Sequence, residues 1–168
     1  RSGKYLYFMA STDIGEGLDS QNMSSFAYVN NTSSIYCIVL RKDDENPLHP
    51  ESDEEPIRTG KKPEKPENEE AEPKGETKID FDGLEERIIA LPMDRQIYSG
   101  LEAGPAGTLF VIAQSPRATA VDGPSGPPEL LKFSFEDREA NTFAAGANGF
   151  EITPDGSKML LMAGGGPS

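Results

Sequence analysis

The stretch "GFEITPDGSKMLLMAGGG" (149–166) holds two short apolar runs joined by Pro-Asp-Gly. Glycine readily adopts the positive φ that a tight turn requires, and Pro and Asp are typical of the turn positions before it. Each flanking run has the length of a β-strand rather than that of a helix. The stretch therefore predicts an antiparallel β-hairpin.

Two other apolar runs follow a glycine in the same way. "SGKYLYFMAS" (2–11) and "AGTLFVIAQS" (106–115) each place the glycine shortly ahead of the apolar residues. Further strands are expected beside these Gly-led runs, at "SIYCIVLR" (34–41), "ERIIALPM" (86–93), "ELLKFSFE" (129–136) and "NGFEITP" (148–154). The chain thus predicts a succession of strands and turns with little helix.

The spacing of the Gly-led runs indicates a repeat. The last two lie about 50 residues apart, and the first two lie about 66 apart once the unusual segment 41–78 is set aside. A period of roughly 40–50 residues that holds four strands is typical of a β-propeller blade. We therefore expect an all-β partial propeller over 1–168, with two to three four-stranded antiparallel blades that are incomplete at both ends.

The unusual segment differs in composition from the rest of the chain. Residues 41–78 contain 13 acidic residues and six prolines, with few large apolar side chains. Such a segment buries too little apolar surface to offset the entropy lost on ordering. We expect a mobile, acidic, Pro-rich insertion over 42–78, with strand pairing resuming near "IDFDGL" (79–84). Its charge would suit cations or a basic partner, but a solvated spacer is the favoured interpretation.

"FDGLEERIIALP" (81–92) allows two interpretations. Its apolar residues stand at helical spacing, whereas the pair Ile88–Ile89 is β-branched and a proline follows soon after. The second observation favours strands. This interpretation places an outer strand at 78–82, a turn at Asp82-Gly83 and an inner strand at 86–92.

The charge balance excludes some classes of partner. The chain has 29 acidic and 16 basic residues, which give a net charge of −13. Nucleic acids and anionic membrane surfaces are bound through Lys and Arg, so neither is an expected partner. The single cysteine excludes an intramolecular disulfide and a multi-cysteine metal site. We expect a cytoplasmic protein, with a periplasmic one as the alternative.

The residues capable of catalysis are few. His49 is the only histidine and lies at the head of the acidic segment, where an exposed loop residue is favoured over a general base. Cys37 lies in an apolar run, where a buried free thiol is favoured over a nucleophile. We therefore expect no catalytic residue in this chain, and no peptidase activity from it alone.

Three stretches resemble binding motifs without matching them. Asp13, Glu16 and Asp19 in "TDIGEGLDS" do not have the spacing of a calcium loop. "GLEAGPAGT" (100–108) has no lysine after its last glycine, as a phosphate loop requires. "GPSGPP" (123–128) departs from the Gly-x-Ser-x-Gly nucleophile elbow. We expect neither a metal nor a cofactor.

Five stretches together carry a family resemblance. They are "KYLYFMASTD", "SSIYCIVLRKDDENPLHPESDEE", "IDFDGLEERIIALPM", "YSGLEAGPAGTLFVIA" and "FEITPDGSKMLLM", in this order. The chain resembles the second propeller of bacterial tricorn-type serine peptidases over nearly its whole length. In that family two propellers precede a PDZ domain and a catalytic portion. The resemblance implies that the catalytic serine, histidine and glutamate lie downstream, so no catalytic residue is assigned here.

The resemblance also implies a role. Tricorn propellers act as scaffolds and channels for peptides or unfolded polypeptides that move to a catalytic site elsewhere in the parent chain. Arg87, Arg95 and Glu151 are the charged residues near the expected inner strands, where they either face the tunnel or serve packing and the rim. The expected partners are peptides, the other domains of the parent and further copies of the chain. The alternative is a free-standing β-rich binding module that recognises a protein or peptide through an edge strand or the acidic segment.

Overall fold

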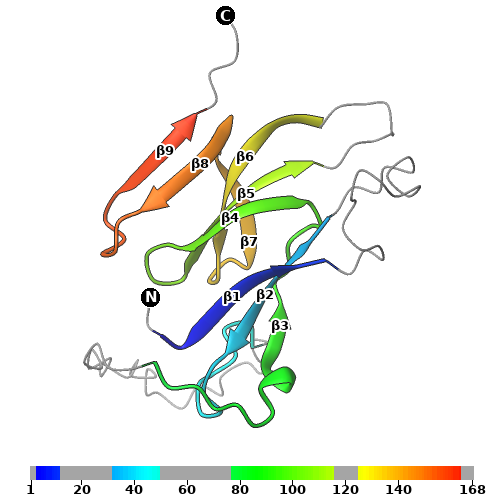
Figure 1. The fold of residues 1–168 in the computed structure, drawn as a ribbon, viewed down its shortest axis with the longest axis vertical. Helices are drawn as coiled ribbons and strands as arrows, with labels where there is room; N and C mark the ends of the chain where they lie inside the picture. The colour runs from blue at the N-terminus through cyan, green and yellow to red at the C-terminus, as the bar shows by residue number, and fades with distance from the viewer. Residues whose placement is uncertain (1–2, 12–31, 50–76, 116–124, 164–168) are drawn as a thin grey trace, which may run out of the picture.

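The computed structural model describes residues 3–11, 32–49, 77–115 and 125–163. They form antiparallel sheets and no α-helix, which confirms the all-β expectation (Figure 1). The strands are β1 (Tyr5–Ala10), β2 (Ser34–Val39), β3 (Ile88–Ala90), β4 (Ile97–Ala103), β5 (Thr108–Ser115), β6 (Ser125–Ser134), β7 (Glu139–Ala145), β8 (Ala147–Ile152) and β9 (Met159–Ala163). Among these residues, no helix is long and apolar enough to cross a membrane.

The strands are grouped into three sheets in chain order. The first sheet has the order β1-β2-β3, the second β4-β5-β6-β7 and the third β8-β9. The second sheet lies between the other two, and β8 and β9 sit on the side away from β1 (Figure 1). Each sheet is thus built from strands that follow one another along the chain, as in successive propeller blades.

Tight turns with a glycine at positive φ join the strands of two equivalent hairpins. Gly107 has φ 75° between β4 and β5, and Gly156 has φ 72° between β8 and β9. A residue with a side chain rarely adopts this conformation, so glycine is the natural choice at both turns. The hairpin predicted from Pro-Asp-Gly is confirmed, with Phe150 opposite Leu161 in its ladder.

Two apolar clusters hold the sheets together. The first joins the first two sheets and contains Ile35, Cys37, Leu91, Tyr98, Leu109, Val111, Ala113 and Phe133. The second joins the last two sheets and contains Phe110, Ile112, Leu130, Ala147 and Phe150. Successive residues of β5 therefore serve opposite faces of the middle sheet, because side chains alternate along a strand.

The structure corrects the interpretation of residues 78–92. Residues 77–81 form no strand, and Leu84–Arg87 is a short 3₁₀ helix that ends where β3 begins. β3 pairs with β2 through Ile88 opposite Ile38, so it is the third strand of the first sheet. The prediction that 86–92 is an inner strand was wrong, because apolar β-branched residues indicate a strand but not which neighbour it pairs with.

Two strands were not predicted. β4 has the sequence IYSGLEA, in which a bulge beside Gly100 interrupts the pairing with β5 and breaks the alternation of apolar residues. β7 has the sequence EANTFAA and is exposed at most of its positions. Because neither strand is a continuous apolar run, hydrophobic patterning alone does not reveal them.

Only the ends of the expected acidic insertion lie within the described residues. Residues 50–76 are outside them, so the expected mobility of that part stays a prediction. At the near end, Leu48 packs against the first apolar cluster. The Tyr5 hydroxyl donates to the Glu45 carbonyl oxygen at 3.0 Å, which also ties this end to the first sheet.

Candidate functional site

The two residues that were considered and not favoured as catalytic groups, Cys37 and His49, lie in different environments. Cys37 is fully buried in β2, within the first apolar cluster, and burial raises the pKa of its thiol to about 12. At neutral pH the sulfur is therefore a thiol and not the thiolate that attacks substrates. His49 is exposed, and its backbone carbonyl oxygen accepts a hydrogen bond from the Arg138 guanidinium at 2.6 Å.

No group of three or more metal-ligating side chains is present in the part of the chain that the structure describes. The loop with Asp13, Glu16 and Asp19 lies outside that part, so its interpretation stays a prediction. The glycine-rich stretch 100–108 forms the end of β4 and the turn into β5, and the end of 123–128 that is described belongs to β6.

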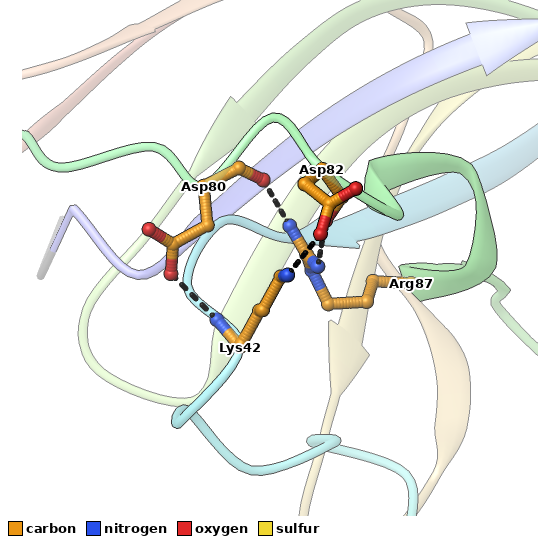
Figure 2. Close-up of polar contacts among 4 residues, drawn as sticks. All are labelled: Lys42, Asp80, Asp82 and Arg87. Carbon is orange, nitrogen blue, oxygen red and sulfur yellow. Dashed lines mark hydrogen bonds and ion pairs between the residues drawn. The ribbon is translucent and has the colours of Figure 1, made fainter.

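A polar cluster closes the base of the acidic insertion (Figure 2). We call it the clasp, and it consists of Lys42, Asp80, Asp82 and Arg87. The Lys42 backbone N–H donates to Asp80 Oδ2 at 3.0 Å, and Lys42 Nζ is 2.5 Å from Asp82 Oδ2. The Lys42 hydrogen bond lowers the pKa of the Asp80 carboxyl, and the nearby Arg87 and Lys42 charges act in the same direction.

Arg87 joins the end of β2 to residues 80–82 at the clasp. Its Nε donates to the Val39 carbonyl oxygen at 3.0 Å, and its terminal nitrogens donate to the carbonyl oxygens of Asp82 at 3.1 Å and of Asp80. A planar guanidinium with several fixed donors suits this bridging better than an ammonium would. The clasp therefore holds the chain before the insertion beside the chain after it.

Sequence reasoning did not find the clasp. It placed Arg87 near an inner strand, whereas the side chain is occupied at the end of β2 and beside the 3₁₀ helix. The available signal was the alternation Asp80-Phe81-Asp82 at the point where apolar residues resume, with Lys42 at the other end of the insertion. Arg95 and Glu151 are both exposed.

The first strands of two sheets are linked by a carboxylate that the sequence reasoning also missed. The backbone N–H of Ile152 in β8 donates to Glu102 Oε2, on β4, at 3.2 Å. The bond is partly buried, so it is shielded from competing water. Glu102 therefore connects the second sheet with the third.

The order of the strands and the packing of successive sheets define a β-propeller type of segment. No family model matches the chain. The chain is 27% identical over 169 residues to tricorn protease homolog 1 of Streptomyces coelicolor, which covers 97% of this chain and 15% of that relative. It is also similar to the crystal structure of the tricorn protease, with a TM-score of 0.55 and 13% identity over 95% of this chain and 14% of that one.

These comparisons confirm the resemblance inferred from the sequence. The sequence match and the structural match each extend over nearly the whole chain and agree on a tricorn-like propeller segment. The chain spans about 15% of the length of the curated relative.

Proposed function

We propose that this chain is a non-catalytic propeller part of a tricorn-like serine peptidase, where it serves as scaffold and as channel for peptides. The observation that carries the proposal is the match to the tricorn homolog over 97% of the chain. The stacked sheets support it, because a propeller places its first strands around a tunnel. The tunnel-side strands are then β4 and β8, and the catalytic groups belong to another part of the parent.

A photocrosslinking experiment tests the channel role. A photoreactive benzoylphenylalanine replaces Ser99, which is exposed on β4, and a control carries it at Asn141, which is exposed on β7. The probe is carboxymethylated α-lactalbumin, which is an unfolded polypeptide. We expect crosslinks from position 99 and few from position 141. Equal yields at the two positions, or none at either, would contradict the proposal.

The chain alone is proposed to have no peptidase activity. Its histidine is exposed on a loop, and its cysteine is a buried thiol with a raised pKa. A triad requires a nucleophile held against a base. The purified chain should therefore neither cleave fluorogenic peptides nor react with a serine-directed fluorophosphonate probe. Turnover together with labelling of a single serine would show that the chain is an enzyme in its own right.

The second candidate function is a free-standing binding module. The observation that favours it is the outer edge of β9, which pairs with no other strand among the described residues. Such an edge, or the acidic segment, could recognise a protein or peptide partner. The sequence of the parent reading frame distinguishes the two candidate functions. It should continue into PDZ-like and serine-peptidase portions if the chain is part of a tricorn-like peptidase, and should lack them if the chain is a free-standing binding module. Association with further copies and a cytoplasmic location are part of the first proposal.

A further inference from the structure

Polar bonds tie the junction between the first two sheets at each end of β2. Just before β2, the Ser33 N–H donates to the carbonyl oxygen of Gln96, which precedes β4, at 2.9 Å. Beyond the other end of β2, residues 44–49 contact both sheets, and we call them the strap. The junction is therefore fastened by two polar ties in addition to the first apolar cluster.

Three contacts hold the strap against the two sheets. From β1 in the first sheet, the Tyr5 hydroxyl donates to the Glu45 carbonyl oxygen at 3.0 Å. From the turn between β6 and β7 in the second sheet, the Arg138 guanidinium donates to the His49 carbonyl oxygen at 2.6 Å. The Leu48 side chain packs against the apolar cluster that the two sheets share. The strap thus bridges the sheets through two bonds to its backbone and one apolar anchor.

The strap also has hydrogen bonds within itself. The Asn46 side-chain oxygen accepts the Leu48 N–H at 2.8 Å, and the Asn46 carbonyl oxygen accepts the His49 N–H at 3.0 Å. Such a turn needs no partner outside the strap. The clasp precedes the strap and joins Lys42 to Asp80 through a bond that involves no strap residue. The strap can therefore leave the sheets as a unit, without breaking its own turn or the clasp.

Two features of the docked strap cost free energy. Asp44 Oδ2 is buried and has no hydrogen-bond partner among the described residues, so docking removes its hydration without replacing it. Arg138 has φ 57° and is the one residue other than glycine with a positive φ in the described part of the chain. A side chain is strained in this conformation, whereas glycine is not. The donor to His49 is therefore supplied by a position that would suit glycine better.

We propose that the strap is a releasable latch on the junction between the first two sheets. The bonds from Tyr5 and Arg138 are exposed, so water competes for the same groups and each bond contributes little net stability. The buried Asp44 oxygen opposes docking, so the docked and released states lie close in free energy. After release, the Ser33 bond and the apolar cluster remain, and the two sheets separate more often. The strap thereby connects the acidic insertion, which continues from residue 50, to the packing of these sheets.

The native Cys37 thiol reports opening of the junction, because it is fully buried in the shared apolar cluster and is the only cysteine of the chain. Arg138→Gly removes the donor to His49 and relieves the positive φ, so we expect maleimide labelling of Cys37 roughly tenfold faster with little change in the thermal midpoint. Glu136→Gly, at an exposed position of the same turn, is the matched control and should not change the labelling rate. Equal rates in the two variants would overturn the proposal.

Asp44 provides a test of the opposite sign. Asp44→Asn replaces the buried carboxylate with a neutral amide, which costs less to bury, so the strap should dock more firmly and Cys37 labelling should become about threefold slower. Asp43→Asn, at an exposed neighbouring position, is the control and should leave the rate unchanged. Faster labelling in Asp44→Asn would show that the carboxylate holds the strap in place, which contradicts the proposed balance.

A second measurement separates release of the strap from unfolding of the whole chain. The Ile152 N–H is bonded to Glu102 where the second sheet meets the third, so its hydrogen exchange reports a junction that the strap does not touch. In Arg138→Gly, and in Leu48→Ala, which removes the apolar anchor, Cys37 labelling should become faster while Ile152 exchange stays unchanged. If both rates rise by the same factor, these variants weaken the whole fold, and the strap is not a latch on one junction.

Discussion

At the scale of the residue, Asp155 organises the turn between β8 and β9. Its carboxylate accepts hydrogen bonds from the Ser157 hydroxyl at 2.7 Å and the Ser157 N–H at 3.1 Å, and from the Thr153 hydroxyl. These bonds, with the Thr153 bond the largest contribution, lower the pKa of the carboxyl to about 2. An exposed side chain thus contributes to the turn through bonds to its immediate neighbours, as is usual for Asp in turns.

The lowered pKa predicts how the hairpin depends on pH. A carboxyl with a folded-state pKa of about 2 and an ordinary value of 3.8 stabilises the fold fully above pH 3.8, and this contribution is lost as the pH falls through about 2. Asp155→Ala should therefore lower the thermal midpoint at pH 7 by more than it does at pH 2, where the folded-state carboxyl is already partly protonated. Thermal melts across this range check it, with Glu136→Ala at an exposed turn position as the control. A constant difference at every pH would contradict the assignment.

At the scale of the element, the clasp sets the path of the chain on either side of the acidic insertion. The Asp80 N–H donates to the Leu40 carbonyl oxygen at 2.9 Å, beside the bonds that Lys42 and Arg87 make. The chain therefore leaves β2 and returns toward β3 at nearly the same point. Because the entropic cost of closing a loop rises only slowly with its length, a long insertion at this point costs the fold little more than a short one would.

The clasp arginine should be sensitive to replacement. Arg87→Ala leaves three carbonyl oxygens without their donor, and we expect a loss of about 1–3 kcal/mol in the free energy of unfolding. Arg87→Lys should recover only part of this, because an ammonium cannot span the same three acceptors. Urea unfolding measures both, with Lys132→Ala at an exposed position of β6 as the control. A loss no larger than that of the control would show that these bonds exchange freely with water.

The acidic insertion beyond the clasp is expected to be dispensable. Residues 50–76 are dense in Pro and Glu, and the clasp and Leu48 stay in place when they are removed. Replacing them with a short Gly-Ser linker should lower the thermal midpoint by less than about 8 °C, which corresponds to roughly 2–4 kcal/mol for a domain of this size. A larger drop in the melting experiment would mean that the segment packs on the sheets.

At the scale of the whole molecule, apolar side chains remain exposed on both outer sheets. On the first sheet, Leu6 and Ile88 are 51% and 42% exposed on the side away from the first apolar cluster. On the third, Leu160 is 63% exposed. The middle sheet is covered on both faces by comparison, since each of its faces contributes to one cluster. Packing of the three sheets therefore buries the apolar side chains on both faces of the middle sheet. The outward faces of the first and third sheets keep exposed apolar side chains that are available for contacts.

The open edge of β9 predicts self-association of the isolated chain. Among the described residues β9 pairs only with β8, so its other edge carries unpaired N–H and C=O groups there, beside exposed apolar residues. An unprotected edge recruits another strand. At about 100 µM, size-exclusion chromatography with light scattering should give a mass above that of the monomer. Leu160→Lys should reduce the association, whereas Thr142→Lys on β7 should not. A monodisperse monomer at this concentration would contradict the prediction.

Some features of the chain followed from local sequence alone. The Gly-led apolar runs predicted β1, β5 and β9, because positive φ at glycine and the length of an apolar run are properties of neighbouring residues. The burial of Cys37 and the exposure of His49 followed in the same way. The family resemblance also lay in consecutive residues, and the comparisons confirmed it.

Other features were decided by tertiary structure. β4 and β7 are defined by their neighbours, since their own side chains carry little apolar pattern. The pairing of β3 with β2 joins segments separated by the whole acidic insertion, and the Glu102 bond to Ile152 joins residues 50 apart. A long-range hydrogen bond forms only where the folded backbone brings two distant groups together. Hydrophobic patterning indicates which residues are buried, but it does not indicate which distant residue each one contacts.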